Sequence, residues 1–310
     1  MSFNSIIVGV DPTPASVAAA ETGARIAQAA GAACQLVHGS RLLFDPPATA
    51  EFLSDVELLV EHHLARARGT IVDALRGSVS EEYLASLEVR LGQPAGVVGE
   101  VAHERQADLV IVGGKHHTPL ARWIGGSTAL HLVRSTDVPL LVVVQQARAL
   151  RRVLMAVDLS YALQPTVRAA MRLARLFDAE VRVLHVVEPL PAVAELPVTL
   201  SDEAFVADSE AQLARALESL TDTVVAGPVL RRGPAAPTIV EEATAWNADV
   251  VVVGSHGKGW MHRLLVGSVT EQLLNALPTS LLVVPTTTHS AGSREKTAKT
   301  PREREDQIVI

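Results

Sequence analysis

Short runs of consecutive apolar residues alternate with longer amphipathic segments along most of the chain. Val250–Val253 and Leu281–Val284 are apolar at every position, which is typical of strands buried on both faces of a parallel sheet. Between such runs, apolar residues return every three or four positions, as at Ala169, Leu173 and Leu176. That spacing indicates one face of a helix. The pattern therefore predicts an α/β fold in which strands and helices alternate.

The chain contains two copies of this pattern. Residues 6–11 (IIVGVD) return 147 positions later as 153–158 (VLMAVD), and residues 92–114 return 141 positions later as 233–255. A solenoid or propeller repeat has a period of only about 20–50 residues. The two copies are therefore expected to be whole domains.

The domains are predicted to span 1–147 and 148–287, with a short polar linker at 145–152. Residues 288–310 break the pattern because charged and small residues dominate them. We expect this tail to be disordered, with docking of its apolar end, Ile308–Ile310, as the alternative.

Each domain is predicted to be a doubly wound, five-stranded parallel sheet of order 3-2-1-4-5 with helices on both faces, because five β-α units with right-handed crossovers produce that arrangement. Ligands bind such sheets at the carboxyl ends of the strands, where the strand order reverses. In the second copy we expect strands near 152–157, 181–187, 223–231, 249–254 and 281–285, and helices near 160–177, 201–219, 234–246 and 267–277.

Composition narrows the class of protein further. The 310 residues are 48% hydrophobic but only 3% aromatic, so the core must consist mainly of aliphatic side chains. A net charge of −7 argues against a nucleic-acid partner, which usually requires a basic face. Cys34 is the only cysteine, which suits a reducing compartment. With no signal-like N-terminus and no apolar run of about 20 residues, we expect a cytoplasmic protein that does not cross a membrane.

A glycine-containing stretch, 254–268 (GSHGKGWMHRLLVGS), follows the apolar strand of the second copy. It is not a Walker A loop, because Gly259 rather than Ser or Thr follows Lys258. Glycines let backbone N–H groups approach phosphate oxygens, and a helix that begins next to them adds unpaired N–H groups. Lys258 and Arg263 would add positive charge. The alternative is that this stretch only connects a strand to a helix.

The spacing of Gly254, Gly257 and Gly267-Ser268 is G-x-x-G, nine residues, G-[ST]. It resembles the adenine-nucleotide motif of the universal stress protein family. Together with the repeat and with an aspartate that ends each first strand, it makes residues 1–287 resemble a tandem universal stress protein. The resemblance implies ATP binding with Mg²⁺ or Mn²⁺. Ser268 and Glu271 also have the spacing of a capping box, which is compatible with a phosphate contact.

The resemblance also implies how the adenosine would be held, through the aspartate that ends the first strand and the backbone after the second strand. An N-cap or turn role is the alternative for Asp158, and His185 is expected to pack in the interior. The full implied nucleotide-binding set is Asp158, Val186, Gly254, His256, Gly257, Gly267, Ser268, Val269 and Thr270.

The first copy departs from the motif. His116 stands where the second glycine belongs, and Gly39 stands where the second copy has Val186. A non-glycine residue with positive φ would cost roughly 1 kcal/mol there. We expect the first domain to bind nucleotide weakly or not at all, with the weaker candidate residues Asp11, Gly113, Gly126 and Ser127.

Other functions fit the sequence less well. There is no G-x-S-x-G sequence and no pair of carboxylates beside the glycines, so no catalytic residue is predicted, although slow ATP hydrolysis stays open. The adjacent pairs His62-His63 and His116-His117 do not predict a metal site, because neighbouring side chains on a helix diverge and cysteine ligands are missing. A protein-interaction scaffold of the same fold, without nucleotide, is the remaining alternative.

The sequence thus predicts an ATP-binding protein with a stress-response or regulatory role. Its two apolar strands at 139–144 and 280–285 would be exposed edges, which invite pairing. We expect them to pair within the chain, which leaves a homodimer optional. The sequence does not predict which proteins are its partners.

Overall fold

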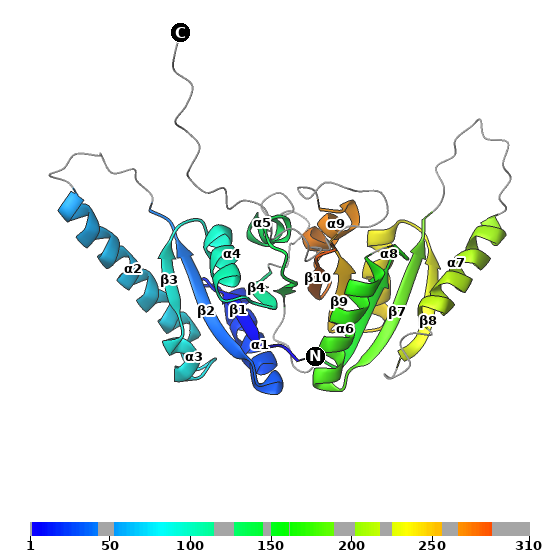
Figure 1. Cartoon of the computed structure of the whole chain (residues 1–310), viewed down its shortest axis with the longest axis horizontal. Helices are drawn as coiled ribbons and strands as arrows, with labels where there is room; N and C mark the ends of the chain where they lie inside the picture. The colour runs from blue at the N-terminus through cyan, green and yellow to red at the C-terminus, as the bar shows by residue number, and fades with distance from the viewer. Residues whose placement is uncertain are drawn as a thin grey trace, which may run out of the picture.

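The computed structural model describes residues 2–42, 53–114, 127–144, 150–160, 162–188, 202–217, 225–255 and 266–286. It has two similar α/β halves that lie side by side (Figure 1). The predicted disordered tail and residues 145–149 of the predicted linker lie outside the described residues.

The first half follows the predicted alternation of strands and helices. Its elements are β1 (Ser5–Gly9), α1 (Pro14–Ala30), β2 (Ala33–Ser40), α2 (Leu53–Leu75), α3 (Glu81–Ala85), β3 (Glu88–Leu91), α4 (Pro94–Glu104), β4 (Leu109–Gly113), α5 (Ser127–Ser135) and β5 (Leu140–Val143).

The second half contains every strand and helix expected from the sequence, with ends that differ by at most three residues. Its elements are β6 (Arg152–Val157), α6 (Leu163–Phe177), β7 (Glu180–Val187), α7 (Asp202–Leu217), β8 (Val225–Arg232), α8 (Ala235–Ala245), β9 (Val250–Gly254), α9 (Ser268–Ala276) and β10 (Ser280–Val284).

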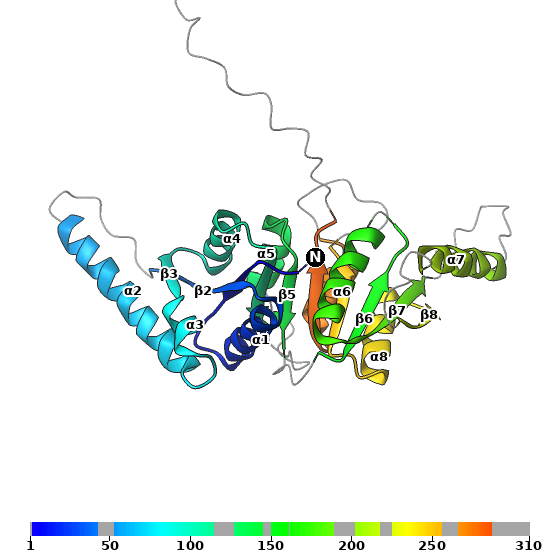
Figure 2. The same ribbon diagram turned by 60° about the horizontal axis from the view of Figure 1, so that its bottom comes forward.

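All ten strands form one sheet, in the order β3-β2-β1-β4-β5-β10-β9-β6-β7-β8. Each half has the strand order 3-2-1-4-5, and its strands are parallel. The halves meet where β5 and β10 lie side by side (Figure 2). These two strands pair antiparallel, with Leu141 opposite Leu282. The predicted pairing of the two domains through these apolar strands is therefore confirmed, and it covers the edge that each domain would otherwise expose.

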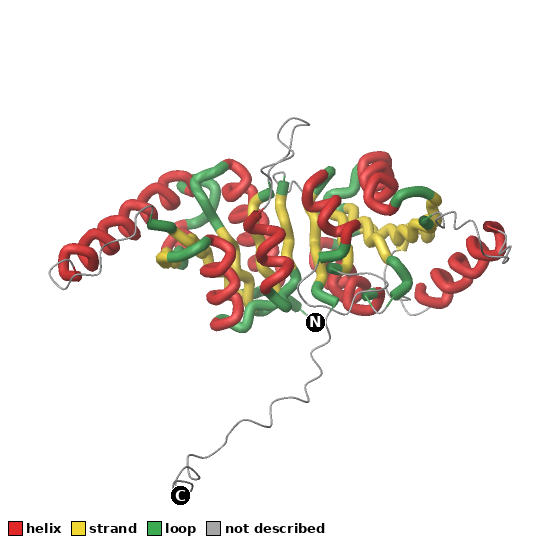
Figure 3. Tube along the Cα trace, turned by 90° about the horizontal axis from the view of Figure 1, so that it is seen from above, coloured by secondary structure: helices red, strands yellow, loops and turns green. Residues whose placement is uncertain are grey.

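Helices cover both faces of this continuous sheet (Figure 3). Alternate strand residues point to opposite faces, so Ile6 and Val8 pack with α1 while Ile7 packs on the side of α4. At the seam, Leu141 and Leu140 likewise enter opposite layers, and each layer contains residues of both halves. The two halves therefore share their hydrophobic layers.

None of the helices in the described ranges combines the length and the hydropathy that crossing a bilayer requires.

Candidate functional site

The second half contains a cavity of about 370 Å³ at the carboxyl ends of β6, β7 and β9. This volume is within the range of about 300–1,000 Å³ that is common for small-molecule sites. Helices α6, α7, α8 and α9 also contribute to its walls. The cavity lies where the strand order of this half reverses, because β6 is between β9 and β7.

Seven of the nine residues predicted for the nucleotide site line this one cavity. His256 and Gly257 lie outside the described residues. The seven residues are Asp158, Val186, Gly254, Gly267, Ser268, Val269 and Thr270.

The start of α9 is held firmly to the end of β9. The backbone N–H of Gly267 donates to the Ser255 carbonyl at 2.9 Å, and the Thr270 hydroxyl donates to the Gly254 carbonyl at 2.8 Å. The first intrahelical bond runs from the Glu271 N–H to the Gly267 carbonyl at 2.9 Å. The N–H groups of the first turn therefore lack intrahelical acceptors at the point where Gly267 to Thr270 line the cavity.

The predicted capping box at Ser268 is wrong. Gly267 is the N-cap of α9, and within the described residues no side chain caps this helix. Because the two bonds to β9 place Ser268 inside the first turn, its hydroxyl is not in the N-cap position. The described residues therefore provide no side-chain cap for the first-turn N–H groups, and Ser268 lines the cavity.

Asp158 has the turn role that the sequence offered as an alternative. Its Oδ1 accepts hydrogen bonds from the Ser160 backbone N–H at 3.1 Å and from the Ser160 hydroxyl at 2.7 Å. Leu159 adopts a positive φ of 57°, and α6 begins only after its N-cap, Ala162. Asp158 is therefore not an N-cap. It is half-buried and also lines the cavity, so the turn holds its carboxylate at the cavity wall.

His185 packs in the interior, as predicted. It is buried, and its Nδ1 lies 2.7 Å from the Val157 carbonyl. Because a carbonyl only accepts, Nδ1 carries the proton in this contact. The hydrogen bond joins the ends of β6 and β7, and the backbone of Val186 follows directly at the cavity wall.

Sequence reasoning missed one wall of the cavity, which consists of α7 and the end of β7. Asp208, Ser209 and Gln212 of α7 line the cavity, together with Glu188. Glu188 Oε1 accepts the Ala235 N–H at 3.0 Å and so binds the start of α8. The α7 segment lies where the repeat offset changes from 147 to 141 residues, so the repeat supplied no aligned counterpart.

In the first half, the corresponding candidates are only partly described. Asp11 follows β1, Gly113 ends β4 and Ser127 begins α5. Gly126 and His116 lie outside the described residues.

The histidine pair on α2 has separate partners. His62 Nδ1 lies 2.9 Å from the Leu58 carbonyl, while His63 Nε2 lies 2.8 Å from the Ser40 hydroxyl. No group of three or more His, Cys, Asp or Glu side chains that could hold a metal ion occurs in the part of the chain that the structure describes.

Comparisons with known proteins identify the family. The model of the Universal stress protein family matches the chain twice, over residues 2–144 and 149–285. The chain therefore belongs to the universal stress protein family, and the resemblance inferred from its glycine spacing and repeat is confirmed.

The most informative relatives are themselves of tandem size. A universal stress protein of Mycobacterium tuberculosis is 29% identical over 304 residues, which cover 87% of this chain and 92% of that protein. One of Mycolicibacterium smegmatis is 27% identical over 292 residues, which cover 90% and 96%. Among solved structures, a universal stress protein from Archaeoglobus fulgidus has the same fold, with a TM-score of 0.65, 15% identity and coverage of 93% of this chain and 100% of that one.

Proposed function

We propose that the second half binds ATP and that this binding gives the protein a nucleotide-dependent regulatory role, of the kind needed in a cytoplasmic stress response. The observation that supports the proposal is the cavity of about 370 Å³ that gathers seven of the nine predicted residues from four separate segments of the chain. A nucleotide has an anionic end and a flat, largely apolar end, and the cavity offers a partner for each.

The anionic end would lie at the start of α9. Uncapped first-turn N–H groups and the partial positive charge of a helix N-terminus favour phosphate oxygens. The aliphatic side chains of Leu163 and Ile239 also line the cavity, where they would contact the base.

The proposed cofactor is ATP with Mg²⁺ or Mn²⁺. Because the described residues include no carboxylate or histidine cluster for the ion, the ion would be held mainly by the phosphates. When bound, it would neutralise part of the phosphate charge. The residues of this chain would then have two tasks: the α9 N–H groups would orient the phosphates, and Asp158 would accept a hydrogen bond from the sugar.

Mass analysis of ligand released from gently purified protein, followed by calorimetric titration with ATP and Mg²⁺, tests this function. We expect an adenine nucleotide to be released and ATP to bind saturably. If no nucleotide is released and ATP does not bind to well-folded protein, the proposal is wrong, and the scaffold function becomes the better account.

A further inference from the structure

Among the described residues that line the second-half cavity, the Asp, Glu, Lys and Arg side chains are all acidic. Asp158, Glu188 and Asp208 line it, and no Lys or Arg is among the described lining residues. These carboxylates come from three different segments, namely the end of β6, the end of β7 and α7. None of the three belongs to α9, which lines the cavity with Ser268 to Thr270.

The sheet places the two ends of the cavity at a distance that fits a nucleotide. Strand β9, which leads to α9, is separated from β7 by one strand, β6. Two strand spacings amount to about 10 Å. If the 5′-phosphates lie at α9, the sugar lies above β6 beside Asp158, and the base lies above β7. Helix α7, which contacts β7 and β8, then closes the far side.

The carboxylates are fixed in this part of the cavity by hydrogen bonds. Glu188 accepts the Ala235 N–H at 3.0 Å, and Asp208 Oδ2 accepts the Gln212 side-chain amide at 2.6 Å. Asp158 is held by Ser160. These contacts hold the three carboxylates in place, so the sugar and base of a bound nucleotide would face them.

Building on the proposed function, we infer that this acidic wall is a specificity device that restricts the site to nucleotides whose charge is confined to the 5′ end. A second anionic group on the sugar, such as a 3′-phosphate, would face these like charges at close range and be repelled by them. Because Glu188 and Asp208 are exposed, salt screens part of this repulsion. The sugar hydroxyl of an unmodified nucleotide can instead donate to these oxygens. The ligand class is therefore the simple nucleoside 5′-phosphates, and 3′-phosphorylated nucleotides are excluded.

Calorimetry with matched ligands tests this inference. The probes are ADP, 3′-phospho-ADP and 3′-O-methyl-ADP, each with the same Mg²⁺ concentration. We expect 3′-phospho-ADP to bind roughly tenfold to a hundredfold more weakly than ADP, and the difference to shrink at high salt. The neutral 3′-O-methyl group controls for bulk and is expected to weaken binding much less than the phosphate.

Protein variants assign the effect to the acidic wall. The double change Glu188→Gln and Asp208→Asn keeps the shape of both side chains and one hydrogen-bond acceptor oxygen on each. It is expected to reduce the discrimination against 3′-phospho-ADP by roughly three- to tenfold. Glu210→Gln is the matched control, because Glu210 is an exposed carboxylate on the same helix that does not line the cavity. It should leave the discrimination unchanged.

Several outcomes would overturn the inference. Equal binding of ADP and 3′-phospho-ADP would do so and leave the proposed function intact. The inference would also be wrong if 3′-O-methyl-ADP and 3′-phospho-ADP bound equally weakly. An unchanged ratio of the ADP and 3′-phospho-ADP affinities in the double variant would overturn it as well. If neither ATP nor ADP binds, the proposed function fails and this inference fails with it.

Discussion

The two halves have the same strand order, but they differ at the carboxyl end of the second strand. A Cβ atom at Gly39 would lie 2.7 Å from the Pro94 Cα at the start of α4, closer than atoms in real structures approach. At the matching positions of the second half, Val186 and Ala235 both line the open cavity. Glycine at position 39 therefore allows α4 to approach β2 closely, whereas the matching residues of the second half line the cavity.

The aspartates that follow the first strand of each half, Asp11 and Asp158, also differ in their surroundings. Asp11 Oδ1 accepts the Thr13 N–H at 3.1 Å, the Ser16 hydroxyl at 2.6 Å and the Thr13 hydroxyl. In the second half, Asp158 Oδ1 accepts hydrogen bonds from the Ser160 N–H at 3.1 Å and the Ser160 hydroxyl at 2.7 Å. Helix α1 begins three residues after Asp11, whereas α6 begins five residues after Asp158. The first half thus uses its aspartate to start a helix, while the second half places it beside a cavity.

The largest expected effect comes from a negative charge at the start of α9. Ser268→Asp should abolish ATP binding, because like charges about 4 Å apart cost on the order of 4 kcal/mol at an effective dielectric constant of 20. That energy corresponds to a roughly thousandfold loss of affinity. The fold should survive, because an aspartate in a first helical turn is favourable by about 0.3–1 kcal/mol. Titration calorimetry and a thermal melt measure the two effects.

Ser127→Asp, at the start of α5, is the control for this change in the first half. It should leave ATP binding to the chain nearly unchanged. Retained wild-type affinity in folded Ser268→Asp protein would show that the start of α9 does not hold phosphate.

The second-largest effect is expected in the ATP affinity of the two halves. To admit a ligand, the first half would have to separate Gly39 from Pro94, and such repacking costs roughly 1–3 kcal/mol. ATP should therefore bind the first half roughly tenfold to a hundredfold more weakly than the second. Calorimetry is expected to give about one strong site per chain. Two sites of equal affinity would contradict this comparison and leave the family membership untouched.

The regular elements could be predicted from the sequence because their patterns are local. Val250–Val253 is apolar at every position and forms β9, and the apolar edges became β5 and β10 at the seam. The helix starts were less predictable, because hydrogen bonds with distant or non-helical residues determine them. The turn at Asp158 comes before α6, which begins after Ala162. At α9, Gly267 rather than Ser268 is the N-cap.

The walls of the site were also only partly predictable. A motif can place Gly267 and Ser268, because it records spacing along the chain. It could not place Asp208 or Gln212, because their contribution depends on how α7 lies against the sheet. The close approach of α4 to β2 at Gly39 could not be predicted either, because it depends on Pro94, a residue distant in the sequence.

A smaller effect, on the free energy of unfolding, is expected for a change at the seam between the halves. There, Arg172 of α6 contacts residues of the first half. Its guanidinium donates to Asp108 Oδ2 at 2.8 Å and to the Ser2 carbonyl, and it lies 3.8 Å over the Phe3 ring. Arg172→Met should lower the free energy of unfolding by roughly 1–2 kcal/mol, because charged hydrogen bonds and a cation–π contact are lost. Denaturant unfolding measures the change.

Arg25 of α1 is the matching position in the repeat and provides the control. Within the described residues it takes part in no ion pair, so Arg25→Met should have a much smaller effect. Equal effects of the two changes would mean that the seam does not depend on the contacts of Arg172.

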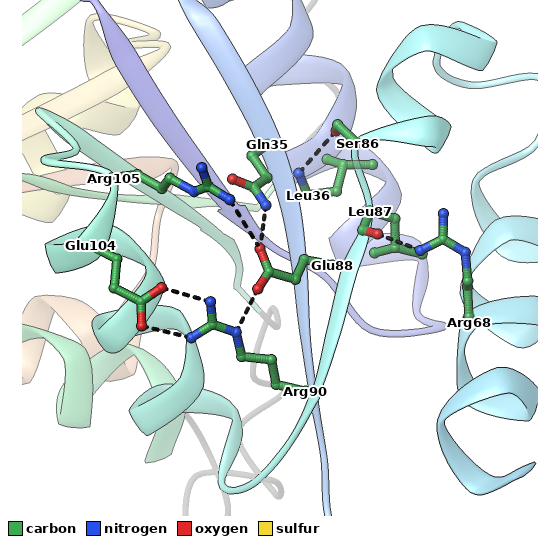
Figure 4. Close-up of polar contacts among 9 residues, drawn as sticks. All are labelled: Gln35, Leu36, Arg68, Ser86, Leu87, Glu88, Arg90, Glu104 and Arg105. Carbon is green, nitrogen blue, oxygen red and sulfur yellow. Dashed lines mark hydrogen bonds and ion pairs between the residues drawn. The ribbon is translucent and has the colours of Figure 1, made fainter. Parts of the chain in front are cut away.

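The smallest effect is expected in a polar network on the outer part of the first half (Figure 4). Arg90 of β3 holds Glu104 of α4 through two bonds of 2.9 and 2.6 Å, and it also pairs with Glu88. The counterpart in the second half is more deeply buried: Glu242 of α8, whose side chain is only 5% exposed, pairs with Arg182 and Arg231. The Glu104 side chain is 50% exposed, so solvent weakens its ion pair.

Glu104→Gln should therefore reduce stability only slightly at pH 7, and less than Glu242→Gln does. The hydrogen bonds from Arg90 lower the pKa of Glu104 from its ordinary value of 4.5. A carboxyl group with a lowered pKa in the folded state contributes its stabilisation above the ordinary pKa and loses it as the pH falls through the lowered one. Thermal melts of the wild type and of Glu104→Gln should consequently differ at pH 7 and converge below pH 4.5. A difference that stays constant across this range would mean that the charge of Glu104 does not contribute to folding.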